Sequence, residues 1–363
     1  MKTLIYSAAA LSLTSFALAN DSDWSAFDLE AEALASSLQD DNTTPSITGF
    51  IDTYFNNTGD NLPTPGGAGA PGAAADTQGF TVPNARVRMN GSNTGYGYNV
   101  EYDFVGARLL DANVSFMLGD INATMGAFRA PLSASGLRDT EDVFFVNRSI
   151  IGNATSARQA GAMLNGVFDG KLNWAVAVQN GVDGTVDEHL ISARGTYDFM
   201  GDGHGADSTE GSYGGTDDMN GTVGVSFADD GGVMGAGLGG GFFGVDATVS
   251  TGQYWVSLEI ADFEAGYTGT GSEGAGLNAI TGAADQSPMV LAGGWMLTPD
   301  EWELGLRYTD TDNGAADTTM IDIAANHYNN GHDVKWTIQF TQIDSDPGGP
   351  DGSAISAGVT VSF

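Results

Sequence analysis

The sequence of 363 residues has no cysteine, only 12 lysines and arginines, and no long apolar run beyond residue 20. Without cysteine it has neither disulfide bonds nor thiolate ligands for a metal. The basic residues face 46 acidic ones, a net charge of −34, which excludes the basic surface that nucleic-acid binding requires. A membrane-spanning helix needs about 18 or more apolar residues in a row, so any membrane crossing has to be made by strands.

The first residues are typical of a secretory signal peptide. Lys2 supplies a positive charge, residues 4–16 form a short apolar core, and Ala17 and Ala19 provide a cleavage site of small residues. We therefore expect residues 1–19 to be removed after export to the periplasm. Loss of Lys2 changes the net charge from −34 to −35.

From residue 47 to 363 the chain alternates apolar and polar residues in short runs separated by turn residues. The last run, 355–363, alternates in the same way and ends on Phe363. This pattern is typical of a transmembrane barrel with an apolar outer face and a polar lumen. It predicts an all-β, antiparallel barrel of about 16 strands over 47–363 in the bacterial outer membrane. We expect outer-membrane lipids around it, the barrel assembly machinery as a partner that recognises the closing strand, and Ser356, Thr360 and Ser362 facing water.

The connections predict which end of the barrel carries loops. Tight turns at 119–120, 169–170, 251–252 and 329–332 are expected on the periplasmic side. Longer segments at 56–81, 130–158 and 269–288 are expected outside the cell. By the same count, segment 199–220 is periplasmic, yet it is long and acidic, and the sequence offers no reason for it.

Segment 20–46 predicts a short periplasmic helix. Its apolar residues are spaced alternately three and four apart, and they are Trp24, Phe27, Ala31, Leu34 and Leu38. One interpretation is an amphipathic helix at the barrel mouth; the other is a small coiled coil that holds a trimer together. The spacing lasts for only two heptad repeats, which is too short to decide between the helix and the coiled coil.

Basic residues concentrate in one region. Of the 11 that remain after Lys2 leaves the total of 12, seven lie between residues 86 and 158. Arg86 and Arg88 share one strand face opposite apolar neighbours, so we expect both to point into the lumen. We expect segment 130–158 to fold inward and narrow the pore; the alternative is that its arginines pair with acids and pin it to the wall. The pore-lining candidates are Arg86, Arg88, Arg108, Arg129, Arg138, Arg148, Arg158, Asp139, Glu141 and Asp142.

Two stretches carry a resemblance to a known family. The first holds Gly126, Phe128, Pro131, Ser133, Phe145, Arg148, Ser149, Arg158 and Gly161, and the second covers 292–308, 325–328 and 331–332. In order and spacing they resemble the phosphate-selective porin O and P family of outer-membrane channels. The resemblance implies a sixteen-stranded trimeric channel with loops folded into the lumen. The chain departs from that family because Lys171 and Lys335 are its only lysines after Lys2, so a lysine cluster for phosphate is missing.

The predicted function is passive diffusion of ions and small polar solutes, with anions such as phosphate as one option. The alternatives are a structural barrel that tethers the envelope with little conductance, and an outer-membrane hydrolase. The four histidines, His189, His204, His327 and His332, lie in no serine or aspartate motif that indicates catalysis, so we expect no enzyme. The spaced aspartates from Asp310 lack a complete calcium loop, and we expect no metal and no cofactor.

Replacing Arg86 and Arg88 with alanine tests the predicted lumen-lining role. Removing two positive charges from a pore should shift its reversal potential toward cations. The measurement is made in planar bilayers under a salt gradient. An unchanged ion preference would contradict the role.

Overall fold

The computed structural model describes most of the chain beyond its N-terminal segment. The described residues are 45–59, 77–156, 158–181, 189–204, 208–230, 240–265, 267, 285–311, 317–329, 331–346 and 351–363. The predicted signal peptide, the predicted N-terminal helix and most of segment 269–288 lie outside them. Among these residues, no helix is both long and apolar enough to cross a membrane.

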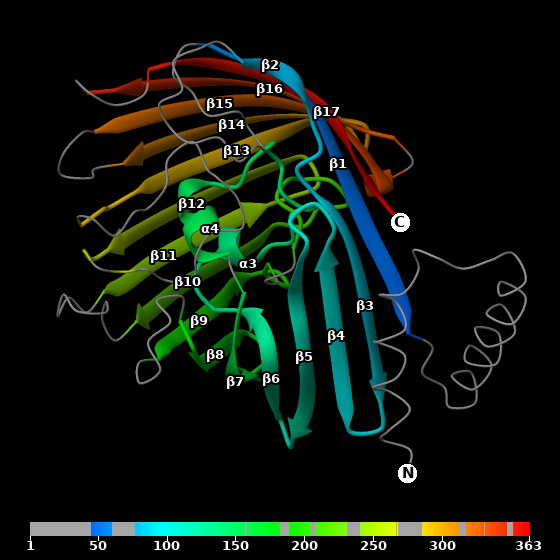
Figure 1. Ribbon diagram of the computed structural model, residues 1–363, viewed down its shortest axis with the longest axis vertical. Helices are drawn as coiled ribbons and strands as arrows, with labels where there is room; N and C mark the ends of the chain where they lie inside the picture. The colour runs from blue at the N-terminus through cyan, green and yellow to red at the C-terminus, as the bar shows by residue number, and fades with distance from the viewer. Residues whose placement is uncertain are drawn as a thin grey trace, which may run out of the picture.

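Antiparallel strands make up nearly all of the described structure (Figure 1). They are β1 (Ser46–Thr58), β2 (Thr77–Thr81), β3 (Ala85–Asn93), β4 (Tyr96–Asp103), β5 (Arg108–Leu118), β6 (Ile121–Arg129), β7 (Arg158–Phe168), β8 (Leu172–Gln179), β9 (Leu190–Met200), β10 (Asn220–Asp229), β11 (Gly241–Ser250), β12 (Tyr254–Phe263), β13 (Met289–Thr298), β14 (Trp302–Thr311), β15 (Thr318–Tyr328), β16 (Val334–Ser345) and β17 (Gly352–Ser362). Two short helices, α3 (Ala134–Leu137) and α4 (Ile150–Thr155), and a 3₁₀ turn, η2 (Gly331–Asp333), complete the list.

The sheet closes into a barrel of sixteen strands, which confirms the prediction. β2 and β3 both pair with β1 and are two halves of one strand, interrupted near Pro83. Proline has no N–H to donate, so a break in the ladder is expected there. The Asp52 N–H still donates to Asn84 O across the break (3.0 Å).

The first and last strands form the closing seam. Residues 50–58 of β1 pair with 354–362 of β17. The Thr360 hydroxyl donates to Asp52 Oδ1 (2.7 Å), and Phe363 exchanges two backbone hydrogen bonds with Gly49 (2.8 and 2.9 Å). The predicted closing strand is therefore confirmed.

The two ends of the barrel differ. At one end, here named the turn end, the predicted short connections at 119–120, 169–170, 251–252 and 329–332 are confirmed. The opposite end, named the loop end, carries the connections that include 130–156. The connection between β9 and β10 is the one long connection at the turn end. The order of the strands predicts it at this end.

The outer and inner faces alternate as predicted. On β14, Trp302, Leu304 and Leu306 are 41, 42 and 54% exposed, whereas the inward Glu303 and Arg307 are 0 and 2% exposed. An apolar belt around a closed barrel is the surface that lipid requires.

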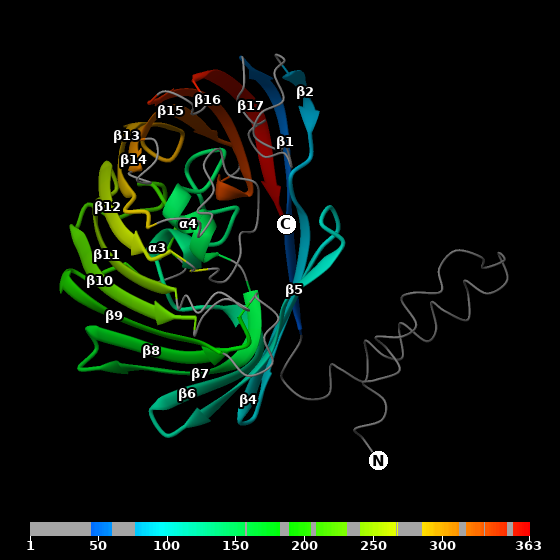
Figure 2. The same ribbon diagram turned by 60° about the vertical axis from the view of Figure 1, so that its left-hand side comes forward.

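The interior corrects one prediction. Ser356 and Thr360 are only 2 and 3% exposed, so the expectation that they face water is wrong. Thr360 is enclosed by Asp52 and Tyr54, to which its hydroxyl is bonded. More generally, α3 and α4 lie inside the ring of strands, so part of the interior is filled with protein (Figure 2).

Gly126 provides a test of the barrel geometry. Its φ is +124°, and an added Cβ would overlap with Ala112 O. Gly126→Ala should therefore destabilise the barrel by about 2 kcal/mol or more. The measurement is the urea midpoint of the heat-modifiable band on gels. Gly195→Ala is the matched control, since Gly195 has open space around its Cβ position. Equal urea midpoints for the two variants would contradict the requirement for glycine at position 126.

Candidate pore constriction

Residues 130–156, which follow β6 and precede β7, fold into the lumen and are named here the inward loop. It carries both α-helices of the described chain (Figures 1 and 2). Each begins on a serine cap: Ser133 Oγ accepts from the Gly136 N–H (2.9 Å), and Ser149 Oγ accepts from the Gly152 N–H (3.0 Å). Such caps satisfy N–H groups that a helix end leaves unpaired.

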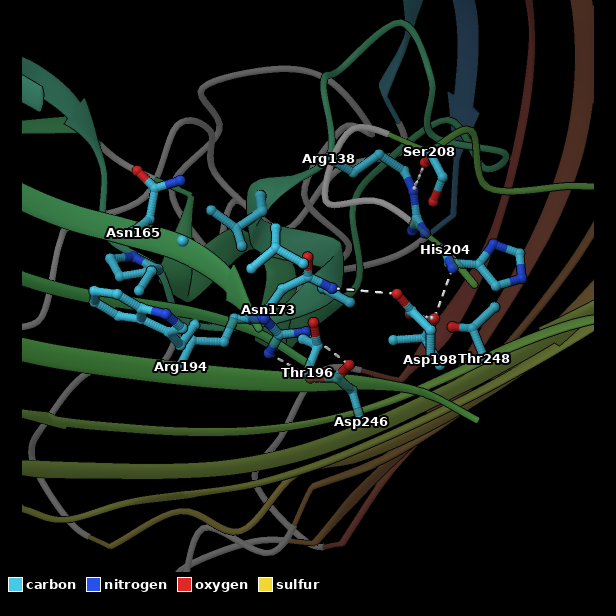
Figure 3. Close-up of a pocket in the computed structure, with 18 of the residues that line it drawn as sticks. Arg138, Asn165, Asn173, Arg194, Thr196, Asp198, His204, Ser208, Asp246 and Thr248 are labelled. Carbon is cyan, nitrogen blue, oxygen red and sulfur yellow. Dashed lines mark hydrogen bonds and ion pairs between the residues drawn. The ribbon is translucent and has the colours of Figure 1, made fainter. Parts of the chain in front are cut away.

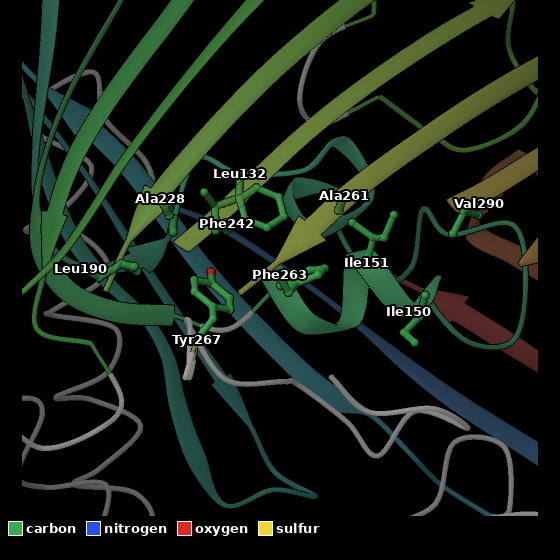
Figure 4. Packing of buried hydrophobic residues seen from close by; sticks show 11 residues of the cluster. Leu132, Ile150, Ile151, Leu190, Ala228, Phe242, Ala261, Phe263, Tyr267 and Val290 are labelled. Atoms are coloured by element: carbon green, nitrogen blue, oxygen red, sulfur yellow. The ribbon is translucent and has the colours of Figure 1, made fainter. Parts of the chain in front are cut away.

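Apolar contacts hold the inward loop against the wall formed by β9–β13. Its buried side chains join a cluster that consists of Ala130, Leu132, Ile150, Ile151, Leu190, Ala228, Phe242, Ala261, Phe263, Tyr267 and Val290 (Figure 4). Phe144 and Phe145 form a second cluster with Trp255, Ala292 and Ala324. Full burial of one such large side chain stabilises by roughly 1.5–3 kcal/mol, so this side of the loop is firmly seated.

Cationic side chains of the wall donate to the loop's backbone carbonyls. Lys335 Nζ donates to Glu141 O (2.8 Å) and Val143 O (2.7 Å). Arg307 donates to Asn147 O (2.8 Å), and Arg194 donates to Leu132 O. Buried carbonyls need such partners, and bonds to charged donors are stronger than those to neutral ones.

Arginines on the opposite wall meet the loop's acids. Arg88 lies 2.9 Å from Asp139 and 3.7 Å from Glu141. Arg129 lies 2.8 Å from Asp139 and also donates to Leu137 O (2.7 Å). These contacts are the ones expected if the arginines pin the loop to the wall.

A buried carboxylate on β4 joins these arginines into one network. Glu101, 1% exposed, lies 3.5 Å from Arg86, 3.1 Å from Arg88 and 3.2 Å from Arg158. Arg158 also lies 3.1 Å from Asp111. Six of the ten candidates thus belong to one network: Arg86, Arg88, Arg129, Arg158, Asp139 and Glu141.

The other four candidates have these contacts. Arg108 lies 3.8 Å from Asp103 at the start of β5 and is 42% exposed. Arg148 donates to Ser135 O (2.6 Å) and to Thr140 Oγ1 (3.0 Å), which also accepts from Arg86 (3.2 Å). Arg138 and Asp142 contact segment 201–219.

That acidic segment, which the sequence left without explanation, is a second inward element. Residues 208–219, named here the strap, enter from the turn end. Arg138 Nε donates to Ser208 O (2.7 Å), and the Glu210 N–H donates to Asp142 O (2.8 Å). The Glu210 carboxylate accepts from the Phe144 N–H (2.9 Å) and lies 3.9 Å from Arg138.

The strap is also fixed to the wall at the turn end. The Ser212 N–H donates to Glu303 Oε1 (2.7 Å), and the Tyr213 ring lies 4.4 Å from that of Tyr328. The inward loop and the strap therefore meet inside the barrel and cover its β11–β16 side.

A cavity of about 500 Å³ lies between the inward loop and the wall formed by β7–β11 (Figure 3). Two of its charged groups, Arg194 and Asp198, are held by neighbouring strands. Arg194 makes two bonds with Asp246 (2.6 and 2.8 Å), and Asp198 accepts from Asn173 (3.2 Å) and Thr222 (2.5 Å).

Protonation differs between neighbouring acids of the loop. Burial opposes ionisation of Asp139, but Arg129 and Arg88 outweigh it and lower the pKa of Asp139. Burial and the Asp139 charge raise the pKa of Glu141 to about 7. Glu141 is 18% exposed, so its charge near neutral pH is felt in the lumen.

Sequence reasoning did not single out Arg194, Arg307 or Lys335 as candidates. One clue was available, because Arg307 and Lys335 occupy inward positions between apolar outward residues. What the pattern could not indicate is that a loop some 160–194 residues away supplies their partners.

The raised pKa of Glu141 predicts a pH-dependent selectivity. As pH rises from about 6 to about 8, the Glu141 carboxyl group loses its proton and becomes negatively charged. The permeability of K⁺ relative to Cl⁻ should therefore increase about twofold. Reversal potentials in bilayers measure this ratio. Glu141→Gln should abolish this pH-dependent change in the permeability ratio, whereas Glu301→Gln, at the exposed turn end, should retain it. A change that survives in Glu141→Gln would show that another group titrates.

Neither a family model nor a curated protein matches the sequence. Solved structures do match. An anion-selective porin from Comamonas acidovorans has 12% identity and a TM-score of 0.62, covering 89% of this chain and 100% of that one. The outer membrane channel DcaP of Acinetobacter baumannii has 14% identity and a TM-score of 0.60, covering 88 and 97%. The trimer form of OmpT, an outer membrane protein of Vibrio cholerae, has 10% identity and a TM-score of 0.57, covering 89 and 100%. At these identities the likeness shows the fold: this chain folds as an outer-membrane porin does.

Proposed function

We propose that the protein is a porin that lets ions and small polar solutes diffuse passively across the outer membrane. The observation that carries the proposal is the closed sixteen-stranded barrel with an apolar belt, narrowed from inside by a seated loop. A barrel that only tethered the envelope would have no need for an inward loop held by buried charges. Export directed by the predicted signal peptide, and insertion by the barrel assembly machinery, belong to the same proposal.

Assembly as a homotrimer belongs to the same proposal. Its support is the likeness in fold to a Vibrio cholerae protein whose structure is described as a trimer form. The heptad spacing of the N-terminal segment offers a further means of holding three copies together.

Phosphate is proposed as one permeant anion without a capturing site. The residues that carry the family resemblance have structural roles here. Gly126 has a positive φ within β6, Ser133 and Ser149 cap the helices, and Arg148 donates to Ser135 O. The nearby arginines Arg88 and Arg158 already face carboxylates. These contacts account for the motif without phosphate.

The hydrolase alternative has one feature to weigh. His204 Nε2 lies 3.0 Å from Ser250 Oγ, a distance suited to a serine–histidine pair. Ser250 is only 8% exposed, and burial together with Arg138 lowers the pKa of His204. We therefore propose that this contact ties the segment after β9 to β11 rather than serving catalysis.

Planar-bilayer recording of the purified protein tests the proposal. We expect discrete conductance steps grouped in threes, because three barrels insert together, and little block by millimolar phosphate. Absence of conductance would favour the structural barrel, and strong phosphate block would favour a capturing site. Lipase and protease assays on the same sample test the hydrolase alternative.

A further inference from the structure

The inner wall is divided into a covered part and an open part. On β14–β16 the inward side chains are sealed: Glu303 and Asp322 are 0% exposed and Gln339 is 2% exposed. The inward loop and the strap lie over this side. On β3–β8, by contrast, the inward residues toward the turn end are only partly buried.

Asparagines dominate that open wall, with one on each of six consecutive strands. This asparagine strip consists of Asn90, Asn99, Asn113, Asn122, Asn165 and Asn173, all half-buried. Registers connect its members: Asn99 is opposite both Asn90 and Asn113, and Asn122 is opposite Asn165. The strip therefore spans six neighbouring strands of the wall, with its members directly opposite each other at Asn90–Asn99–Asn113 and at Asn122–Asn165.

The strip lies on the turn-end side of the salt-bridge network. Asn90 comes two residues after Arg88, Asn99 two before Glu101, and Asn113 two after Asp111. A solute that has passed the constriction meets the amides next.

Hydrogen bonds orient several of these amides. Asn113 Nδ2 donates to Ala127 O (2.9 Å), Asn122 Nδ2 to Asn165 Oδ1 (3.0 Å) and Asn173 Nδ2 to Asp198 Oδ2 (3.2 Å). An amide has two donors and an acceptor with two lone pairs, so each retains bonding capacity. Together they offer donors and acceptors without net charge.

The cavity continues this hydrogen-bonding surface and adds the carboxylates of Asp198, Asp202 and Asp246 to it. Asn165 and Asn173 line it together with Thr196 (Figure 3). Its two arginines are engaged, Arg194 by Asp246 and Arg138 by Ser208 O and Glu210. An entering solute meets amide, hydroxyl and carboxylate groups, whereas the positive charges are already paired, so the surface offers little attraction to an anion.

We propose that the asparagine strip and the adjoining cavity form the solute-contacting wall of the pore, and that they favour uncharged solutes rich in hydroxyl groups, such as monosaccharides. This rests on the proposed function and adds the solute class. Hydroxyl groups both donate and accept, as the amides do, so successive hydrogen bonds replace the water that a sugar leaves behind.

The test replaces amides by a side chain of similar size that cannot hydrogen-bond. In Asn113→Leu/Asn165→Leu, swelling of proteoliposomes in glucose should slow about tenfold, the effect of roughly one lost hydrogen bond. Single-channel conductance in KCl should fall less than twofold. Asn57→Leu, on the exposed outer face of β1, is the matched control and should swell as the wild type does.

Asn113→Asp/Asn165→Asp gives an independent readout. If these positions line the path, the added charges should raise K⁺ permeability relative to Cl⁻ about threefold. Heat-modifiable migration on gels verifies folding of each variant. Unchanged glucose swelling in the leucine variant, or unchanged selectivity in the aspartate variant, would overturn the inference while leaving a conducting porin intact. Absence of conductance in the wild type would instead overturn the proposed function.

Discussion

The interior depends on cationic side chains that bond to the inward loop. Basic residues are scarce in this chain, and most of those described act within the loop or on it: Arg86, Arg88, Arg129, Arg138, Arg148, Arg194, Arg307 and Lys335. A buried charge is tolerated only where it has partners, and removal of one partner typically destabilises by about 3–5 kcal/mol. The loop's carbonyls and acids and the wall's cations therefore require one another.

Two insertions from opposite ends of the barrel share this interior. The inward loop comes from the loop end and the strap from the turn end, and they meet where Glu210 accepts from the Phe144 N–H. Each covers polar groups that the other leaves exposed. The lumen that remains is set by how these two segments fit together, in addition to the number of strands.

The inward fold of segment 130–158 is predicted by its clustered charges and by the family resemblance. The strand alternation allowed the sixteen strands and the closing strand to be predicted, because lipid imposes a strict apolar pattern on every outward face. It could not show which inward residues face water. Asp322 and Asn165 occupy equivalent inward positions in the alternation, yet one is fully covered and the other is half-buried. A wall that contacts a polar loop and a wall that contacts water both require polar side chains, so the same pattern describes both. For that reason the burial of Ser356 and Thr360 and the role of the strap emerged only in three dimensions.

The seam between β1 and β17 joins residues more than 300 positions apart, as in the bond from Thr360 to Asp52. Contacts between such distant positions carry a loop-closure entropy cost, which slows folding. The inward loop bonds to strands on both sides of that seam, through Arg88 on β3 and Lys335 on β16. The loop is therefore caught between strands that become neighbours only when the cylinder closes. The last strands therefore complete the surface on which the loop rests as well as the cylinder itself.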